Sequence, residues 1–257
     1  VKLISQPTDE VGRMDAMYFE FSEDLAPKDS LNQWIDMEFI TFDPPASGKF
    51  QWTEAHRLKF TPASPFDEAR PYTATVNEAV LMGKKRNTAF DTIRFHTPMI
   101  VLKEASISWY DEDRYGFDSP VEILLNFTGE IYVPELKDYL NVYRGKEKIE
   151  NLEIGGYGHN SYAKIYLEGL NHSTEKQEFH VEVKKGLPTE HDYAQLETTG
   201  RASATLYPAS ELQIQTVKSH HSNGQQSIQL TASQKIKPEI LRSYLTVTPE
   251  TPFKLES

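Results

Sequence analysis

The clearest regularity along the chain is an alternation of apolar and polar residues with a period of two. In Met17–Phe21, every second side chain is apolar. The same pattern recurs in Leu58–Phe60, Ile93–Phe95, Val121–Ile123, Ile165–Leu167, Phe179–Val183, Leu212–Ile214 and Ile228–Leu230. Because successive side chains of a strand point to opposite faces of a sheet, the alternation predicts sheets with one buried and one solvated face.

Turn-forming residues separate these segments. Asp43-Pro44-Pro45, Ser47-Gly48 and Gly155-Gly156 are breaks of this kind. Asn223-Gly224 lies between two alternating segments and predicts a β-hairpin. No long stretch keeps the 3.6-residue period of a helix. Many short strands separated by turns predict an all-β chain of the β-sandwich or β-barrel class.

A short motif occurs three times along the chain. Each copy has a Ser or Thr at the end of an alternating segment, then an apolar residue, then a proline. The three copies are Ser22, Leu25 and Pro27; Thr128, Ile131 and Pro134; and Ser233, Ile236 and Pro238. We expect the proline to begin about one helical turn, after which Leu136 or Ile240 packs on the core.

The spacing of the copies gives the size of the repeating unit. Thr128 and Ser233 are 233 − 128 = 105 residues apart, and Tyr139 and Tyr244 are 244 − 139 = 105 residues apart. A spacing of 105 residues matches an immunoglobulin-like sandwich. The fold prediction is therefore a series of tandem immunoglobulin-like β-sandwiches.

The repeat also predicts domain boundaries. We expect a first domain over residues 1–98, a second over 99–207, and the beginning of a third over 208–257. Half a sandwich cannot close its own core, so we expect the natural polypeptide to continue past this third segment.

The surroundings of each tryptophan can be predicted from its position in the pattern. Trp34 and Trp52 are expected in a core. Trp109, which shares a strand face with Ile107 near a domain boundary, is expected to pack at a domain junction.

A more specific pattern lies in the first domain. Gly48–Glu54 contains a strand with Trp52, Arg57–Pro62 ends a strand at proline, and Pro71–Val76 opens a strand with Tyr72. With Phe19–Ser22 before them, these segments resemble bacterial Ig-like domains. They are especially similar to the N-terminal macroglobulin-like domains of bacterial alpha-2-macroglobulins.

The resemblance implies a function, a location and partners. It implies a non-catalytic N-terminal scaffold of a protease inhibitor of the cell envelope. Such a protein is exported, periplasmic or at the cell surface, and anchored by a lipid on a residue upstream of this chain. Its partners are the downstream domains of the same polypeptide and, through the full-length protein, proteases. The thioester of this family requires a cysteine, and this chain has none.

Two alternatives remain open. One is an adhesin or carbohydrate-binding surface module, which predicts an exposed strip of aromatic side chains. The other is a set of accessory Ig-like domains of a secreted polysaccharide-acting enzyme, which predicts a catalytic domain elsewhere in the polypeptide.

Composition narrows the classes of function. The 257 residues include 27 Lys and Arg and 38 Asp and Glu, so the net charge is 27 − 38 = −11. This charge argues against nucleic acid as a partner, because phosphates attract basic surfaces. The absence of cysteine excludes disulfides, thiolate metal sites and cysteine nucleophiles. No segment approaches the roughly 18 apolar residues of a membrane span.

Few residues suggest chemistry. The acidic loop with Asp111, Asp113 and Asp118 could supply oxygen ligands for Ca²⁺, but it lacks the EF-hand pattern, and a solvated turn is expected. His220 and His221 are adjacent, so on a strand they point to opposite faces and chelate one metal poorly. No nucleophile elbow or phosphate-binding loop occurs. We therefore assign no catalytic residue, metal or cofactor.

Overall fold

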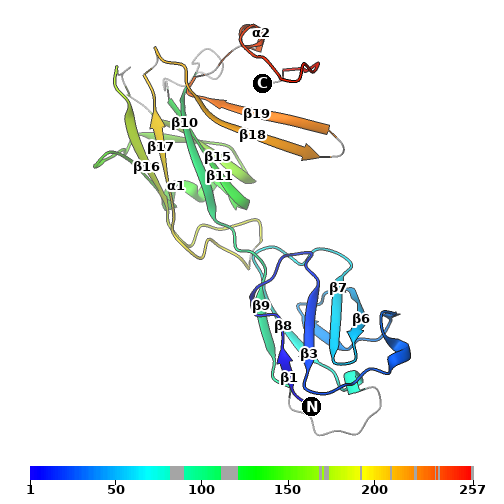
Figure 1. Ribbon diagram of the computed structural model, residues 1–257. Coiled ribbons are helices and arrows are strands. Elements are labelled where there is room, and N and C mark those ends of the chain that lie inside the picture. Colours follow the sequence, from blue (N-terminus) through cyan, green and yellow to red (C-terminus); the bar gives the residue numbers. More distant parts are fainter. Residues whose placement is uncertain are drawn as a thin grey trace. The chain divides into compact units, whose positions relative to one another are not determined.

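The structure is a computed structural model, shown in Figure 1. It describes residues 1–81, 90–110, 121–167, 170, 174–191, 193–208, 210–222, 225–234, 236 and 238–255. The chain forms two compact units, Val1–Ile100 and Val101–Ser257. The predicted division of the second part into residues 99–207 and 208–257 stays a prediction.

The first unit consists of two sheets. One sheet has the order β1-β3-β7-β6-β4, and the other has the order β2-β9-β8-β5. All neighbours are antiparallel except β2 and β9, which are parallel. Two single 3-10 turns, η1 (Lys28–Ser30) and η2 (Glu78–Leu81), lie between strands. The strands are β1 (Leu3–Ser5), β2 (Asp9–Glu10), β3 (Met17–Phe21), β4 (Trp34–Ile35), β5 (Ile40–Asp43), β6 (Gly48–Glu54), β7 (Arg57–Pro62), β8 (Pro71–Val76) and β9 (Ile93–His96).

The second unit contains two four-stranded sheets and a separate hairpin. The sheets have the orders β10-β11-β15-β14 and β13-β12-β16-β17, and the hairpin is β18-β19. The strands are β10 (Leu102–Trp109), β11 (Val121–Tyr132), β12 (Leu140–Arg144), β13 (Glu147–Lys148), β14 (Leu152–Gly155), β15 (His159–Leu167), β16 (Gln177–Val183), β17 (Gly200–Leu206), β18 (Ile214–Ser222) and β19 (Gln225–Ala232). The helical turns are η4 (Val133–Glu135), α1 (Leu136–Tyr139) and α2 (Pro238–Arg242).

The strand order identifies the fold. Immunoglobulin domains pair strands A, B, E and D in one sheet and C, F and G in the other. In the second unit, β10-β11-β15-β14 corresponds to A-B-E-D, and β13-β12-β16-β17 corresponds to C′-C-F-G. In the first unit, β1-β3-β7-β6 and β9-β8-β5 follow the same scheme. The predicted all-β fold of tandem immunoglobulin-like sandwiches is therefore confirmed.

Tyr72 marks the corner between the two sheets of the first unit. It stands near the start of β8, which is strand F, and its hydroxyl accepts a hydrogen bond of 2.9 Å from the backbone N–H of Asp67. A tyrosine in this place with a bond to the preceding corner is a mark of immunoglobulin domains. Burial of the ring raises the pKa of the Tyr72 phenol above its ordinary value, because the charged form is poorly solvated there.

The core of the first unit is rich in aromatic rings. Trp52 is fully buried, as predicted, with ring centroids 5.8 Å from Phe21 and 5.9 Å from Phe39. Tyr72 stacks on Phe95 at 5.5 Å. Tilted and edge-on rings at these distances add to the free energy gained from burying apolar area.

The core of the second unit is mainly aliphatic. Its buried residues come from both sheets and include Val121, Ile123, Leu125, Ile131, Leu136, Val142, Ile165, Leu167, Val181 and Val183. They occupy alternating positions along β11, β15 and β16, as the period-two pattern predicts. Each unit thus has its own buried core.

The repeated motif forms the predicted helical turn in all three copies: η1 after Pro27, η4 and α1 at Pro134, and α2 at Pro238. The prediction for the next apolar residue is confirmed for Leu136, which is fully buried, but wrong for Ile240, which is 56% exposed. The 105-residue spacing itself explains the error. Adding 105 to 136 gives Leu241, which is half-buried.

The outermost strands of the first unit are short. β1 and β4 border one sheet with three and two residues, and β2 and β5 border the other with two and four. The longer strands β3, β6, β7 and β8 are paired on both sides.

Hydrogen bonds secure both ends of the segment that joins the units. The buried Thr97 hydroxyl donates to the carbonyl of Asp67 (2.7 Å) and accepts from the N–H of Arg70 (2.9 Å). In the second unit, the N–H of Val101 donates to Thr128 Oγ1 and the N–H of Thr128 donates to the Val101 carbonyl, both at 3.0 Å. The connection between the anchored residues is therefore very short.

Candidate binding surfaces

The residues predicted to carry chemistry do not form a catalytic or metal site in the described part of the chain. Asp111, Asp113 and Asp118 lie outside the described residues. His220 and His221 are both exposed, and their strand partners are Ser227 and Gln226. Over the described ranges, no group of three His, Asp or Glu side chains is placed to hold a metal ion.

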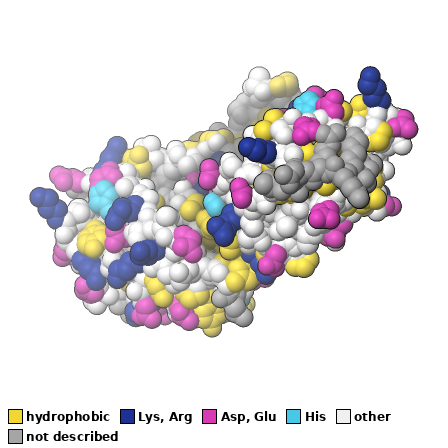
Figure 2. Space-filling view, turned by 90° about the horizontal axis from the view of Figure 1, so that it is seen from below, with side chains coloured by type: hydrophobic (Ala, Val, Ile, Leu, Met, Phe, Trp, Pro, Cys, Tyr) yellow, Lys and Arg dark blue, Asp and Glu magenta, His cyan; other side chains and the backbone are white. Residues whose placement is uncertain are grey.

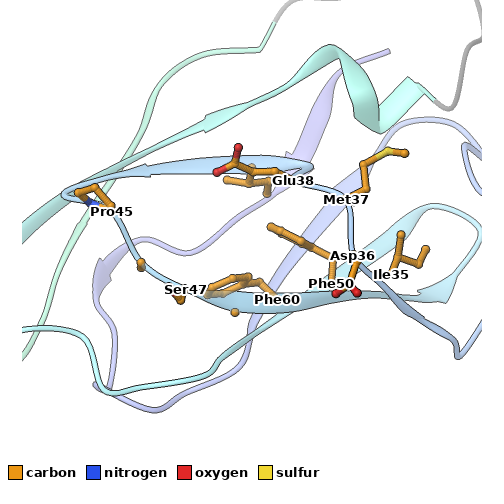
Figure 3. A pocket seen from close by; sticks show the side chains of 11 residues that line it. Ile35, Asp36, Met37, Glu38, Pro45, Ser47, Phe50 and Phe60 are labelled. Carbon is orange, nitrogen blue, oxygen red and sulfur yellow. The ribbon is translucent and has the colours of Figure 1, made fainter.

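A hollow of about 390 Å³ lies at one edge of the first unit (Figure 3). It lies between the segment around Asp36 and Glu38 and the loop after β5, with the rings of Phe50 and Phe60 among its lining residues. Gly48 belongs to this lining, and a Cβ there would meet the Phe60 ring at 2.3 Å. The lining contains no histidine, lysine or arginine, and its charged groups are the carboxylates of Asp36 and Glu38 beside an apolar surface.

Trp34 is on the surface, and its predicted burial is wrong. Its side chain is 53% exposed. β4 has only two residues, Trp34 and Ile35, and Ile35 packs against the core. Neighbouring side chains of a strand point to opposite faces, so Trp34 must point outward. That adjacency was the signal in the sequence that could have placed it.

Trp34 belongs to a row of four side chains that crosses the outer face of its sheet. The register pairs Tyr18 on β3 with Lys59 on β7, Lys59 with Gln51 on β6, and Gln51 with Trp34. The side chains on either side of each of these positions in β3, β6 and β7 are buried. The row therefore has an aromatic ring at each end and polar groups between them.

A positively charged side chain lies close to each of the two aromatic rings at the ends of the row. The guanidinium of Arg57 lies 4.5 Å from the centroid of the Tyr18 ring, and the ammonium of Lys59 lies 6.0 Å from that of Trp34. Arg57 is itself held by Glu20, at 3.2 Å. Cations at these distances are attracted to the negative face of an aromatic ring.

The β18–β19 hairpin is bonded to the sandwich of the second unit. Lys218 Nζ donates to both carboxylate oxygens of Glu104 on β10, at 2.5 and 2.6 Å, and this contact lowers the pKa of Glu104. The buried indole N–H of Trp109 donates to the carbonyl of Tyr207 at 2.7 Å, and the backbone N–H of Trp109 donates to the carbonyl of Ser233 at 3.1 Å. Trp109 thus lies where the second and third repeats meet.

The hairpin also exposes apolar side chains. Ile228 follows Ile123 by 228 − 123 = 105 residues, yet Ile123 is fully buried and Ile228 is 63% exposed. Val217, on the paired strand, is 64% exposed. At Ile228 the hairpin therefore exposes a side chain that is buried at the equivalent position, Ile123, of the preceding repeat.

The surface is otherwise mixed in charge. Figure 2 shows acidic and basic side chains interspersed on the visible face, with apolar side chains in small groups. Among the described helices, none has the length and apolar character of a membrane span.

No family model and no curated protein match the sequence. Solved structures similar to it include an L,D-transpeptidase from Mycobacterium tuberculosis, with 17% identity over 60% of this chain and 59% of that chain and a TM-score of 0.27. L,D-transpeptidase 3 from the same organism has 15% identity over 60% and 58%, also with a TM-score of 0.27. The titin domains z1z2 in complex with telethonin have 10% identity over 79% and 93%, with a TM-score of 0.24.

These matches are distant. The chain spans about three fifths of the length of the transpeptidase chains that it matches. Since all of these TM-scores are far below 0.5, the fold assignment depends on strand order and not on the matches.

Proposed function

We propose that the chain is a non-catalytic scaffold that spaces and supports the other domains of an exported cell-envelope protein. The observation that carries the proposal is the very short connection between two separately cored sandwiches. Thr97 is bonded into the first unit, and Val101 into the second. A connection with few residues between anchored ends limits relative motion, whereas flexible linkers need many residues.

A more specific proposal concerns the full-length protein to which this chain belongs. The strand pattern of Gly48–Glu54, Arg57–Pro62 and Pro71–Val76, together with the 105-residue repeat, supports an N-terminal position in a bacterial alpha-2-macroglobulin-like protease inhibitor. In such a protein the chain would act through its downstream domains, and a lipid upstream of it would hold it at the envelope.

Spin-label distances test the scaffold role. The chain has no cysteine, so Thr75→Cys and Glu153→Cys, both at exposed strand positions, would place one label in each unit. We expect a narrow distribution of distances between the labels. Inserting Gly-Ser-Gly between Met99 and Ile100 should broaden it. A distribution equally broad before and after the insertion would contradict the scaffold role.

The complete reading frame tests the parent assignment. A Cys-x-Glu-Gln motif in a late domain supports an alpha-2-macroglobulin-like protein, and a lectin or hydrolase domain in its place contradicts it. The isolated chain should leave trypsin fully active at equimolar concentration. Stoichiometric inhibition by this chain alone would contradict the assignment of inhibition to other domains.

A further inference from the structure

The row of Tyr18, Lys59, Gln51 and Trp34 has the composition of a ligand-binding surface. It crosses four strands, so its ends are three strand spacings, or roughly 14 Å, apart. This span is longer than a single sugar ring. Tyr18 and Trp34 are both exposed, at 38% and 53%. The surface therefore suits an extended ligand better than a small molecule held in a pocket.

The charges on this face indicate the sign of the ligand. Lys59 belongs to the row, and Lys49 lies on the same face of β6 as Gln51, two residues before it. In the described part of the chain, neither lysine has a carboxylate within ion-pair distance, whereas Arg57 is paired with Glu20 and Glu54. The chain as a whole carries a net charge of −11. Two unpaired lysines beside exposed aromatic rings thus form a local cationic surface that is complementary to an anion.

The polar character of the face indicates its chemical class. The exposed and half-buried polar or aromatic residues of β3, β7, β6 and β4 are Tyr18, Glu20, Arg57, Lys59, Thr61, Lys49, Gln51, Thr53, Glu54 and Trp34, and the exposed aliphatic side chain of this sheet, Ile4, lies on the outermost strand β1. Protein interfaces are organised around a fully buried apolar centre. Here the centre between the rings is an amide and an ammonium, which hydrogen-bond to hydroxyl and acidic groups.

We propose that this face binds an anionic polysaccharide. The C–H face of a sugar ring carries partial positive charge and stacks on the negative face of an aromatic ring, here Trp34. Gln51 bonds the hydroxyl groups between the rings, and Lys59 and Lys49 pair with the acidic groups. Tyr18, held by Arg57, supports the far end of the chain of sugars. Binding of this kind goes beyond a scaffold role and does not depend on it.

Binding is measured with the whole chain and defined polymers. The probes are polygalacturonate, dextran sulfate, neutral dextran and poly-L-glutamate. Trp34 is far more exposed than Trp52 and Trp109, so its fluorescence should change when ligand binds, and calorimetry gives the affinity. We expect binding to at least one anionic polysaccharide, weakening as salt is added, and at least tenfold weaker binding to neutral dextran.

Single substitutions test whether the polysaccharide binds at this face. Trp34→Ala and Lys59→Gln should each weaken binding about tenfold or more, and Trp34→Tyr, which keeps a ring, should retain most of it. The matched controls are in the second unit: Tyr157→Ala, which removes an aromatic ring that is 90% exposed, and Lys146→Gln, at an exposed lysine. Both should bind like the unchanged chain. Thermal melts check that each variant is folded.

Three results would overturn the proposal. One is no binding to either anionic polysaccharide. Another is binding that Trp34→Ala and Lys59→Gln leave unchanged. The third is equal affinity for poly-L-glutamate without dependence on Trp34, which would identify a general surface for acidic polymers such as an acidic protein partner.

Discussion

Trp52 is the residue on which the first core depends most. It is fully buried between Phe21 and Phe39, and within the described ranges its buried indole N–H has no hydrogen-bond acceptor. The ring therefore contributes through packing alone, while the N–H has lost water without compensation.

Substitutions separate these two contributions. Trp52→Ala should lower the free energy of unfolding of the first unit by about 3–5 kcal/mol, because a large cavity remains. Trp52→Phe should cost less than half of that, since it removes the unpaired N–H and keeps most of the ring. Urea denaturation followed by far-ultraviolet circular dichroism measures both. Trp34→Phe, on the surface, is the control and should change little; equal losses for the two Trp52 variants would contradict the argument.

Side-chain placement could be predicted from the sequence wherever a strand is long enough to show its period. Trp52 stands in a seven-residue strand with Phe50, and its burial was predicted correctly. Trp34 stands in a two-residue strand, where no period exists, and only its adjacency to Ile35 could indicate its direction. Ile240 was misplaced by one residue, because the proline of its motif is one position earlier relative to the repeat than Pro134.

Among the elements, the attachment of the β18–β19 hairpin to β10 is open to a direct test. Lys218 lowers the pKa of Glu104, so the folded state binds that proton less tightly than the unfolded state does. The stabilisation is therefore fully present above the pKa of the unfolded state and is lost as the pH falls through the lower pKa of the folded state. Both side chains are more than a third exposed, so solvent screening keeps the contribution below about 1 kcal/mol.

Comparing the unchanged chain with Glu104→Gln tests the pair. At pH 7 the variant should be less stable, and the difference in melting temperature should shrink as the pH is lowered from 5 to 3. Lys218→Met in a double-mutant cycle isolates the pair itself. Glu147→Gln, which removes the exposed pair with Arg144, is the matched control and should show little effect at any pH. A difference that is the same at pH 7 and pH 3 would exclude this mechanism.

Most elements could be predicted from alternation and turn residues, but their irregularities could not. Thr128 was expected to end a strand. Instead β11 continues to Tyr132, with a register shift between Asn126 and Ile131. The paired strands Ile214–Ser222 and Gln225–Ala232 match the predicted hairpin, while Asn223 and Gly224 lie outside the described residues. A bulge depends on the partner strand, which a pattern local to one strand does not contain.

In the whole molecule, two cores of different composition belong to two units. The first is largely aromatic, and the second is largely aliphatic. Units with separate cores can unfold separately, so we expect two transitions in calorimetry. Trp52→Ala should lower only one of them, and Val142→Ala, at a fully buried site on β12, should lower only the other. A single transition that both substitutions shift would show that the units unfold as one.

The short outer strands of the first unit have a consequence for folding. Tandem domains of the same fold belong to one polypeptide, which keeps their unfolded strands near one another at roughly millimolar effective concentration. A long unpaired strand on one domain could then capture a strand of its neighbour. Edges of two to four residues offer too few backbone hydrogen bonds for such capture. Brevity at the edge thus lets this domain finish folding without exchanging strands with its neighbour.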